Sequence, residues 1–269
     1  MKYGIMQGRL LDTFKSQYQA HPILNWEEEF IIAQEKGLHC IEFIVDAYLY
    51  SFNPILTSDG IERIRNLTTR TNVRVNSICA DIFMHWPLKD LLSKESEFYK
   101  KILEDMIYNL SCLGGTDIVI PFVDNSSLKT NEDKDIVIRF LNSFQNICEE
   151  RKINLSLETD LAPQDFYIFL EKFENSRVKV NYDSGNSASL GYKFEDEMNL
   201  YGNKISNIHI KDRSFKGGPK SLGDGDAELS KVKQFINNGH YSGLVIFQAF
   251  RDDKPIETFD KQFSYFKNL

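Results

Sequence analysis

Short apolar runs alternate with longer amphipathic stretches eight times along this chain of 269 residues. The runs have the length of buried β-strands, and the stretches between them carry apolar residues at the spacing of a helix face. The predicted strands cover residues 2–6, 40–45, 73–81, 117–123, 153–160, 178–183, 205–213 and 243–250. Eight strand–helix pairs over this length predict one α/β domain, residues 1–269, folded as a (β/α)8 TIM barrel.

An open, doubly wound sheet is the alternative arrangement for the same alternation of elements. No glycine-rich phosphate-binding loop of the kind found in nucleotide-binding folds follows any predicted strand. Polar residues stand instead at the ends of many strands, which is where barrels carry their active sites. The pattern therefore favours the barrel.

The net charge of the chain indicates which kinds of partner it can bind, and its cysteines indicate the redox state of its compartment. The formal net charge is -7 and the isoelectric point is near 5.4, so no overall positive field attracts nucleic acid. The four cysteines are scattered among apolar neighbours without a CxxC spacing, which indicates buried free thiols in a reducing compartment. Because no signal peptide or run of 18 apolar residues is visible, we expect a soluble cytoplasmic protein with no membrane partner. The oligomeric state stays open, and a homo-oligomer is compatible with the sequence.

Three of the predicted strands carry a side chain that can bind a metal near their ends. In each of them apolar residues alternate with polar ones, and alternate side chains of a strand point to opposite faces. Glu158, Asp183 and His209 all belong to the polar face, close to the carboxyl end of the strand. Because these ends meet at one rim of a barrel, we expect the three side chains to lie together. Lys211 shares the face of His209.

Two carboxylates and an imidazole are a suitable ligand set for one divalent ion, and Mn²⁺, Co²⁺, Mg²⁺ and Zn²⁺ are all compatible with it. The eighth strand is expected to add a fourth ligand. Gln248 has the parity of Leu244 and Ile246, so its side-chain carbonyl can face inward at the matching height. An inward acidic residue or histidine can also be paired with a lysine such as Lys211 without any metal. Three such residues on successive strands favour the metal site.

Five motifs give the chain a resemblance to a known superfamily. They are Met-Gln-Gly-Arg (6–9), Leu-Glu-Thr-Asp (157–160), Asn-Tyr-Asp-Ser-Gly-Asn (181–186), Ile-His-Ile-Lys-Asp-Arg (208–213) and Leu-Gly-Asp-Gly (222–225). With them, nearly the whole chain resembles the xylose isomerase-like TIM barrels, and more narrowly their sugar phosphate isomerase and epimerase branch. The resemblance implies one divalent metal held by Glu158, Asp183, His209 and position 248, where the family has a second glutamate.

Gln248 is the departure from the family pattern. The resemblance implies that the epimerases use both glutamates as paired acid and base on opposite faces of an enediolate. A glutamine cannot take up a proton near neutral pH. Three alternatives follow. Glu158 acts alone as the base of an aldose–ketose isomerase, or the protein binds a sugar without converting it, or another group replaces the second base, namely Lys211, Asp81, His85 or Glu42.

Further polar residues near the strand ends are candidates for contacts with the substrate. Arg213 and Arg251 follow the seventh and eighth strands, where barrels often bind phosphate, and a guanidinium can hold a phosphate or carboxylate by two hydrogen bonds. Salt bridges at the rim are the alternative for both arginines. The other predicted contacts are Asn186, Asp81, His85 and Asp124.

These patterns predict a metal-dependent isomerase or epimerase of a small sugar or sugar phosphate. Glu158 is the predicted base for proton transfer next to a carbonyl, and Lys211 is the second predicted catalytic residue. A metal-dependent lyase or dehydratase acting on a keto acid is the second hypothesis, because elimination can follow the same proton removal. A non-catalytic sugar-binding barrel is the third. An endonuclease of this superfamily is disfavoured, since the chain has five histidines and a negative net charge.

Overall fold

The structure of the protein is a computed structural model that describes residues 2–91, 96–239 and 241–269. Within these residues, eight parallel strands close into a barrel in the order β1–β10–β7–β6–β5–β4–β3–β2, which confirms the predicted fold. The barrel strands are β1 (Tyr3–Met6), β2 (Cys40–Ile44), β3 (Arg74–Cys79), β4 (Asp117–Phe122), β5 (Asn154–Thr159), β6 (Val178–Asp183), β7 (Ile205–Ile210) and β10 (Leu244–Phe247).

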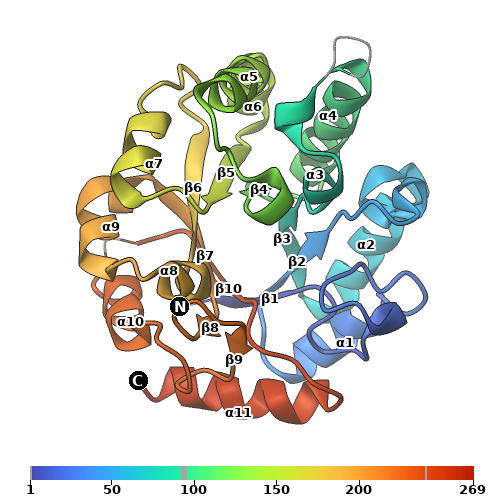
Figure 1. Cartoon of the computed structure of the whole chain (residues 1–269). Helices are drawn as coiled ribbons and strands as arrows, with labels where there is room; N and C mark the ends of the chain where they lie inside the picture. Colours follow the sequence, from blue (N-terminus) through green and yellow to red (C-terminus); the bar gives the residue numbers. More distant parts are fainter. Residues whose placement is uncertain (1, 92–95, 240) are drawn as a thin grey trace.

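Helices surround the barrel, as Figure 1 shows in a view into the ring of strands. The helices are α1 (Glu28–Glu35), α2 (Ser58–Thr71), α3 (Ile82–His85), α4 (Ser96–Cys112), α5 (Asn131–Asn142), α6 (Gln145–Arg151), α7 (Pro163–Leu170), α8 (Ser184–Leu190), α9 (Phe194–Tyr201), α10 (Leu229–Asn237) and α11 (Pro255–Lys267). Among the described residues, no helix combines the length and the apolar character needed to cross a membrane.

The buried apolar residues form two clusters, one on each side of the sheet. The large cluster lies between strands and helices and includes Leu155 and Leu157 of β5. The small one has six buried members and lies inside the barrel: Met6, Cys40, Ile44, Cys79, Val119 and Ile246. Because alternate side chains point to opposite faces, Ser156 and Glu158 of β5 face the barrel interior. The barrel interior therefore contains a small apolar cluster and a polar end, and the candidate active site lies at the polar end.

The seventh strand is shorter than predicted, because β7 ends at Ile210 instead of continuing to residue 213. The next residues form the two-residue strand β8 (Asp212–Arg213), which pairs antiparallel with β9 (Pro219–Lys220). The buried Asp212 carboxylate accepts hydrogen bonds from the N–H groups of Gly223 (2.9 Å), Gly225 (3.1 Å) and Ala227 (3.0 Å). A Cβ atom at Gly225 would lie 2.2 Å from Asp212 Oδ1, so this turn requires glycine. These hydrogen bonds therefore hold the loop between Asp212 and Ala227 beside the carboxyl end of the barrel.

Candidate active site

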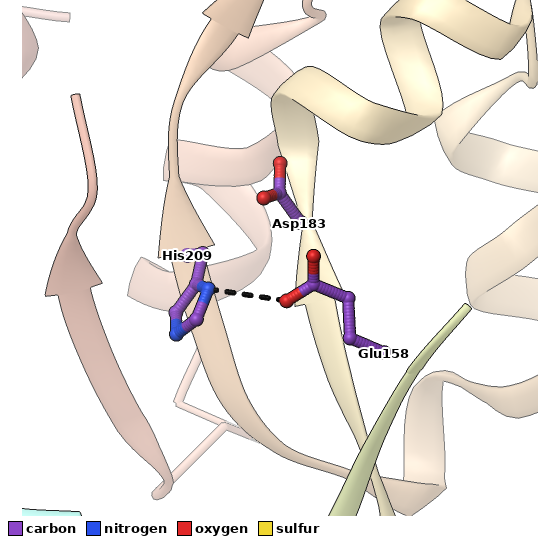
Figure 2. Close-up of side chains that lie close together, drawn as sticks. All are labelled: Glu158, Asp183 and His209. Carbon is purple, nitrogen blue, oxygen red and sulfur yellow. Dashed lines mark ion pairs between the residues drawn. The ribbon is translucent and has the colours of Figure 1, made fainter. Parts of the chain in front are cut away.

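Glu158, Asp183 and His209 meet at the carboxyl end of the barrel, as predicted from their parity. They lie on the neighbouring strands β5, β6 and β7, and Asp183 is paired in register with His209. One potential ligand atom from each residue lies within 4.8 Å of the others, and all three side chains are buried. Figure 2 shows the Glu158 carboxylate pointing toward the His209 ring, with the Asp183 carboxylate close to both. This arrangement offers two oxygens and one nitrogen to a single ion.

The His209 ring is oriented by Glu42, which lies behind it inside the barrel. His209 Nε2 is 2.7 Å from Glu42 Oε1, and Nδ1 is 3.4 Å from Glu158 Oε2. Glu42 is fully buried and also accepts hydrogen bonds from Ser77 Oγ (2.6 Å) and Asn207 Nδ2 (2.7 Å). Glu42 is therefore engaged with protein groups away from the cavity, which removes it from the candidates for the second base. It fixes the ring so that Nδ1 is the atom presented to the site.

Burial and ion pairing act in opposite directions on this pair. Burial alone would lower the pKa of His209, but the charges and hydrogen bonds of Glu42 and Glu158 outweigh it and raise the pKa to about 10. Burial alone would raise the pKa of Glu42, and His209, Ser77 and Asn207 together hold it below its ordinary value. The site therefore favours positive charge at His209, and a bound cation would take the place of the proton on Nδ1.

Two asparagines hold the Glu158 carboxylate in place. Asn186 Nδ2 donates to Oε1 (2.6 Å) and Asn181 Nδ2 donates to Oε2 (2.8 Å). Asn181 Nδ2 also lies 3.1 Å from His209 Nδ1, and Asn181 Oδ1 has no hydrogen-bond partner among the described residues. Asp183 caps α8 by accepting from Asn186 N–H at 2.8 Å. The donor set and this unpartnered buried oxygen beside it fit a divalent cation.

Lys211 and Gln248 complete the polar end of the barrel. Lys211 Nζ lies 3.2 Å from Asp183 Oδ2, 3.3 Å from Gln248 Oε1 and 3.5 Å from Asn186 Oδ1. Gln248 follows β10 directly, its N–H donates to Ile210 O (3.1 Å), and its side chain is buried. The predicted inward direction of Gln248 is therefore present in the structure. Its carbonyl oxygen is engaged by the Lys211 ammonium.

A cavity of about 370 Å³ opens beside these residues. It is lined by Gln19, Cys79, Asp81, Met84, His85, Pro121, Val123, Asp124, Glu158, Asp160, Asn186, Ser189, Leu190, Lys211, Arg213 and Gln248. The predicted contacts Asp81, His85, Asp124, Asn186 and Arg213 are thus all in its wall. Sequence reasoning missed Gln19, because the segment after β1 has no periodic pattern from which its direction can be inferred.

The two arginines proposed as phosphate anchors have different surroundings. Arg213 lines the cavity, where Nη1 donates to Asn186 Oδ1 (2.9 Å) while Nε and Nη2 donate to Gly217 O. Arg251 is buried outside the cavity lining, and its guanidinium donates to Leu11 O (2.6 Å) and Tyr18 O (3.4 Å). Arg251 therefore stabilises the segment after β1 through these hydrogen bonds.

A second buried carboxyl supports the site from behind α8. Glu197 of α9 accepts hydrogen bonds from Ser187 Oγ and Tyr201 Oη, both at 2.8 Å. Burial raises the pKa of Glu197 to about 7, although these hydrogen bonds lower it. The folded state therefore binds more protons than the unfolded chain between about pH 4.5 and 7, and stability falls as the pH rises through this window.

We expect Glu197→Gln to remove this part of the pH dependence. With one pKa unit worth about 1.4 kcal/mol, the wild type loses roughly 3 kcal/mol through Glu197 between pH 4.5 and 7.5, and the variant does not. Urea unfolding of both proteins at these two pH values measures the difference. Equal pH dependence in the two proteins would show that Glu197 is already ionised in the folded state at low pH.

Comparisons with known proteins agree with the fold. A family model described as xylose isomerase-like TIM barrel matches residues 30–269. Among curated proteins, a probable endonuclease 4 from Sulfurihydrogenibium sp. (strain YO3AOP1) is 25% identical in an alignment of 186 residues that covers 58% of this chain and 66% of that protein. An inosose dehydratase from Geobacillus thermodenitrificans (strain NG80-2) is 20% identical in an alignment of 163 residues that covers 52% of this chain and 55% of that protein. The chain thus spans less than two thirds of the length of either relative.

Solved structures match over the full length. A D-psicose 3-epimerase, determined in the presence of D-fructose, has a TM-score of 0.77 at 15% identity and covers 100% of this chain and 99% of its own. The IOLI protein with a binding zinc atom has a TM-score of 0.73 at 16% identity and covers 99% of this chain and 98% of its own. At these identities the likeness is one of fold.

Proposed function

Because the chain belongs to the xylose isomerase-like TIM-barrel family, we propose that it is a divalent-metal-dependent isomerase or epimerase of a small sugar or sugar phosphate. The observation that carries the proposal is the meeting of Glu158, Asp183 and His209 within 4.8 Å beside a cavity of sugar size. The D-psicose 3-epimerase and the zinc-containing IOLI protein, which share the fold, support a sugar substrate and a metal.

Glu158 is the base in this proposal. A divalent ion held by Glu158, Asp183 and His209 would serve as a Lewis acid for the substrate carbonyl. The Glu158 side chain lines the cavity, and the amides of Asn181 and Asn186 fix both of its oxygens. A carboxylate held in this way removes a proton from the carbon next to the carbonyl without having to reorganise first.

Lys211 supplies positive charge next to the same atoms. Its ammonium lines the cavity and keeps its place through Asp183 and Gln248. As negative charge develops on the substrate oxygen during proton removal, a fixed ammonium donor stabilises it. Lys211 therefore acts as an electrostatic and hydrogen-bonding partner of the substrate.

The surroundings of the two arginines favour an unphosphorylated sugar. Arg213 already donates to Asn186 and Gly217, and the Arg251 guanidinium donates to main-chain carbonyls outside the lining. Neither guanidinium is therefore free to hold a phosphate by two hydrogen bonds.

A dehydratase is the second candidate function, and the likeness to an inosose dehydratase favours it. The first step is again removal by Glu158 of a proton next to a carbonyl. Loss of a hydroxyl group from the neighbouring carbon then replaces the return of the proton. The two candidates differ in their products, so one experiment separates them.

The test is incubation of the metal-loaded protein in D2O with matched pairs of ketoses and ketose phosphates, and with cyclic and acyclic keto polyols. Proton NMR follows deuterium entering the carbon next to the carbonyl. We expect exchange in an unphosphorylated ketose, faster than in its phosphate. Formation of a dehydrated product identifies the dehydratase instead. Binding of sugars without exchange or dehydration in any of them would contradict the enzymatic proposal and indicate a sugar-binding barrel.

A further inference from the structure

A chain of hydrogen bonds links Gln248 to a second carboxylate of the cavity. Gln248 Nε2 donates to Gln19 Oε1 (2.9 Å), and Gln19 Nε2 donates to Asp81 Oδ2 (2.7 Å). All three residues line the cavity that also contains Glu158. This series of hydrogen bonds connects three separate parts of the carboxyl end of the barrel: the loop after β1, the loop after β3 and the end of β10.

The orientations of the Gln19 and Gln248 side-chain amides are fixed by neighbouring cations, because arginine and lysine can only donate hydrogen bonds. Arg9 Nη2 donates to Gln19 Oε1 (3.1 Å), so the Gln19 oxygen faces Arg9 and its NH2 group faces Asp81. Lys211 Nζ approaches Gln248 Oε1 in the same way, so the Gln248 NH2 group faces Gln19. A glutamate at position 248 would set a carboxylate oxygen against Gln19 Oε1. The neutral amide of Gln248 is therefore matched to its surroundings.

The Asp81 side chain does not cap a helix, which is a common structural role of an aspartate at such a position. Asp81 precedes α3, but its side chain makes no capping hydrogen bond to that helix. Among the described residues its hydrogen-bond donors are the neutral groups Gln19 Nε2 and Cys79 Sγ (3.2 Å). Burial raises the pKa of Asp81 above its ordinary value, and the charge of Glu158 adds to the effect while the two hydrogen bonds oppose it. These surroundings favour a carboxyl group that can hold a proton.

The other titratable groups in the cavity wall are placed less well for proton transfer. Asp124 and His85 are exposed at the rim. Asp160 accepts a hydrogen bond from Ser127 Oγ. Lys211 forms an ion pair with Asp183. Asp81 is thus the remaining cavity carboxyl that is half-buried and approaches from a part of the barrel other than β5, namely the loop after β3.

We propose that Asp81 is the second proton-transfer residue of the site and that Gln19 and Gln248 position it. The inference rests on the proposed function. Glu158 takes a proton from the carbon next to the carbonyl, and the C–H electron pair passes into the enolate. The enolate carbon then forms a new C–H bond with the proton of the Asp81 carboxyl, on the other face of the same carbon. Exchange with water removes the proton from Glu158 and returns one to Asp81, so protons and charge balance over the cycle.

The experiment uses the metal-loaded full chain and the ketose that the wild type deuterates fastest. It measures two rates in D2O, deuterium entry into recovered substrate and formation of the epimer, together with the Kd of the sugar. The variants are Asp81→Asn, Gln19→Ala, Gln248→Glu and the double variant Asp81→Asn/Gln248→Glu. The matched control is Asp59→Asn, whose side chain is 84% exposed on the outer helix α2.

We expect Asp81→Asn to slow epimer formation by about 100-fold or more while Glu158 continues to exchange the substrate proton with solvent. Gln19→Ala should lower the ratio of epimer formation to exchange in the same direction, which a purely structural effect does not do. The double variant should recover part of the epimer formation, because it returns a carboxylate to the cavity at position 248.

Two results would overturn the assignment while the proposed function stands. One is wild-type epimer formation in Asp81→Asn. The other is an equal loss of exchange and epimer formation with a weakened Kd, which would make Asp81 a binding residue. A wild type that binds sugars but exchanges none of them overturns the proposed function itself, and the role of Asp81 falls with it.

Discussion

Glu158→Gln is expected to lose about 10³-fold in kcat, the middle of the range for loss of a general base. The substitution removes the charge that accepts the proton and one of the two carboxylates that would bind the metal. It also places an NH2 group where Asn181 or Asn186 now donates to a carboxylate oxygen, so one of these hydrogen bonds is lost. Metal affinity should therefore fall together with activity.

The measurements are solvent deuterium exchange in the substrate and calorimetric titration of the metal-free variant with Mn²⁺ or Zn²⁺. Glu97→Gln is the control, because the Glu97 side chain is 81% exposed on α4 and its loss changes the net charge equally. Retention of wild-type exchange in Glu158→Gln would exclude Glu158 as the base. An unchanged metal affinity would exclude it as a ligand, whatever the activity.

Glu42→Ala should destabilise the metal-free protein by about 3–5 kcal/mol, the usual cost of removing one partner from a buried ion pair. His209 and Glu42 are both fully buried, and the hydroxyl of Ser77 and the amide of Asn207 also lose their acceptor. Glu42→Gln keeps an acceptor oxygen for His209, so its effect on stability should be smaller. Without the charge, however, the ring is held less firmly, and we expect metal affinity to fall by about 10–100-fold.

Urea unfolding at pH 7 and metal titration of both variants test this role. Glu97→Ala again serves as the exposed control. A stability loss below about 1 kcal/mol in Glu42→Ala, a value typical of exposed ion pairs, would mean that the pair does not stabilise the fold. Wild-type metal affinity in Glu42→Gln would show that the orientation of His209 does not depend on the carboxylate.

The sequence by itself determined the barrel and the main members of the site. Eight strand–helix units leave few arrangements that bury every apolar face, and the closed barrel is one of them. Strand parity is a local property of the backbone, so it predicts one common face for Glu158, Asp183 and His209, which the structure brings together. The same rule predicts the inward direction of Gln248, whose side chain is buried.

The tertiary structure alone decided the roles of residues in loops and of residues with distant partners. Ile205 to Arg213 has the pattern of one strand, but the hydrogen bonds of Asp212 to residues 223–227 end β7 at Ile210. Gln19 belongs to a segment without periodicity, and only folding brings it between Gln248 and Asp81. These contacts join residues 11 to 229 positions apart, and no local pattern in a single sequence encodes such pairings.

Partners that are distant in the sequence also explain why Glu42 and Arg251 do not line the cavity. Glu42 lies in the middle of β2 and Arg251 follows β10, and the sequence makes both of them candidates for the cavity. Glu42 instead pairs with His209, 167 positions away, and Arg251 donates to Leu11, 240 positions away. A charged side chain that leaves water takes the partners that folding brings within reach, and the three-dimensional arrangement determines which these are.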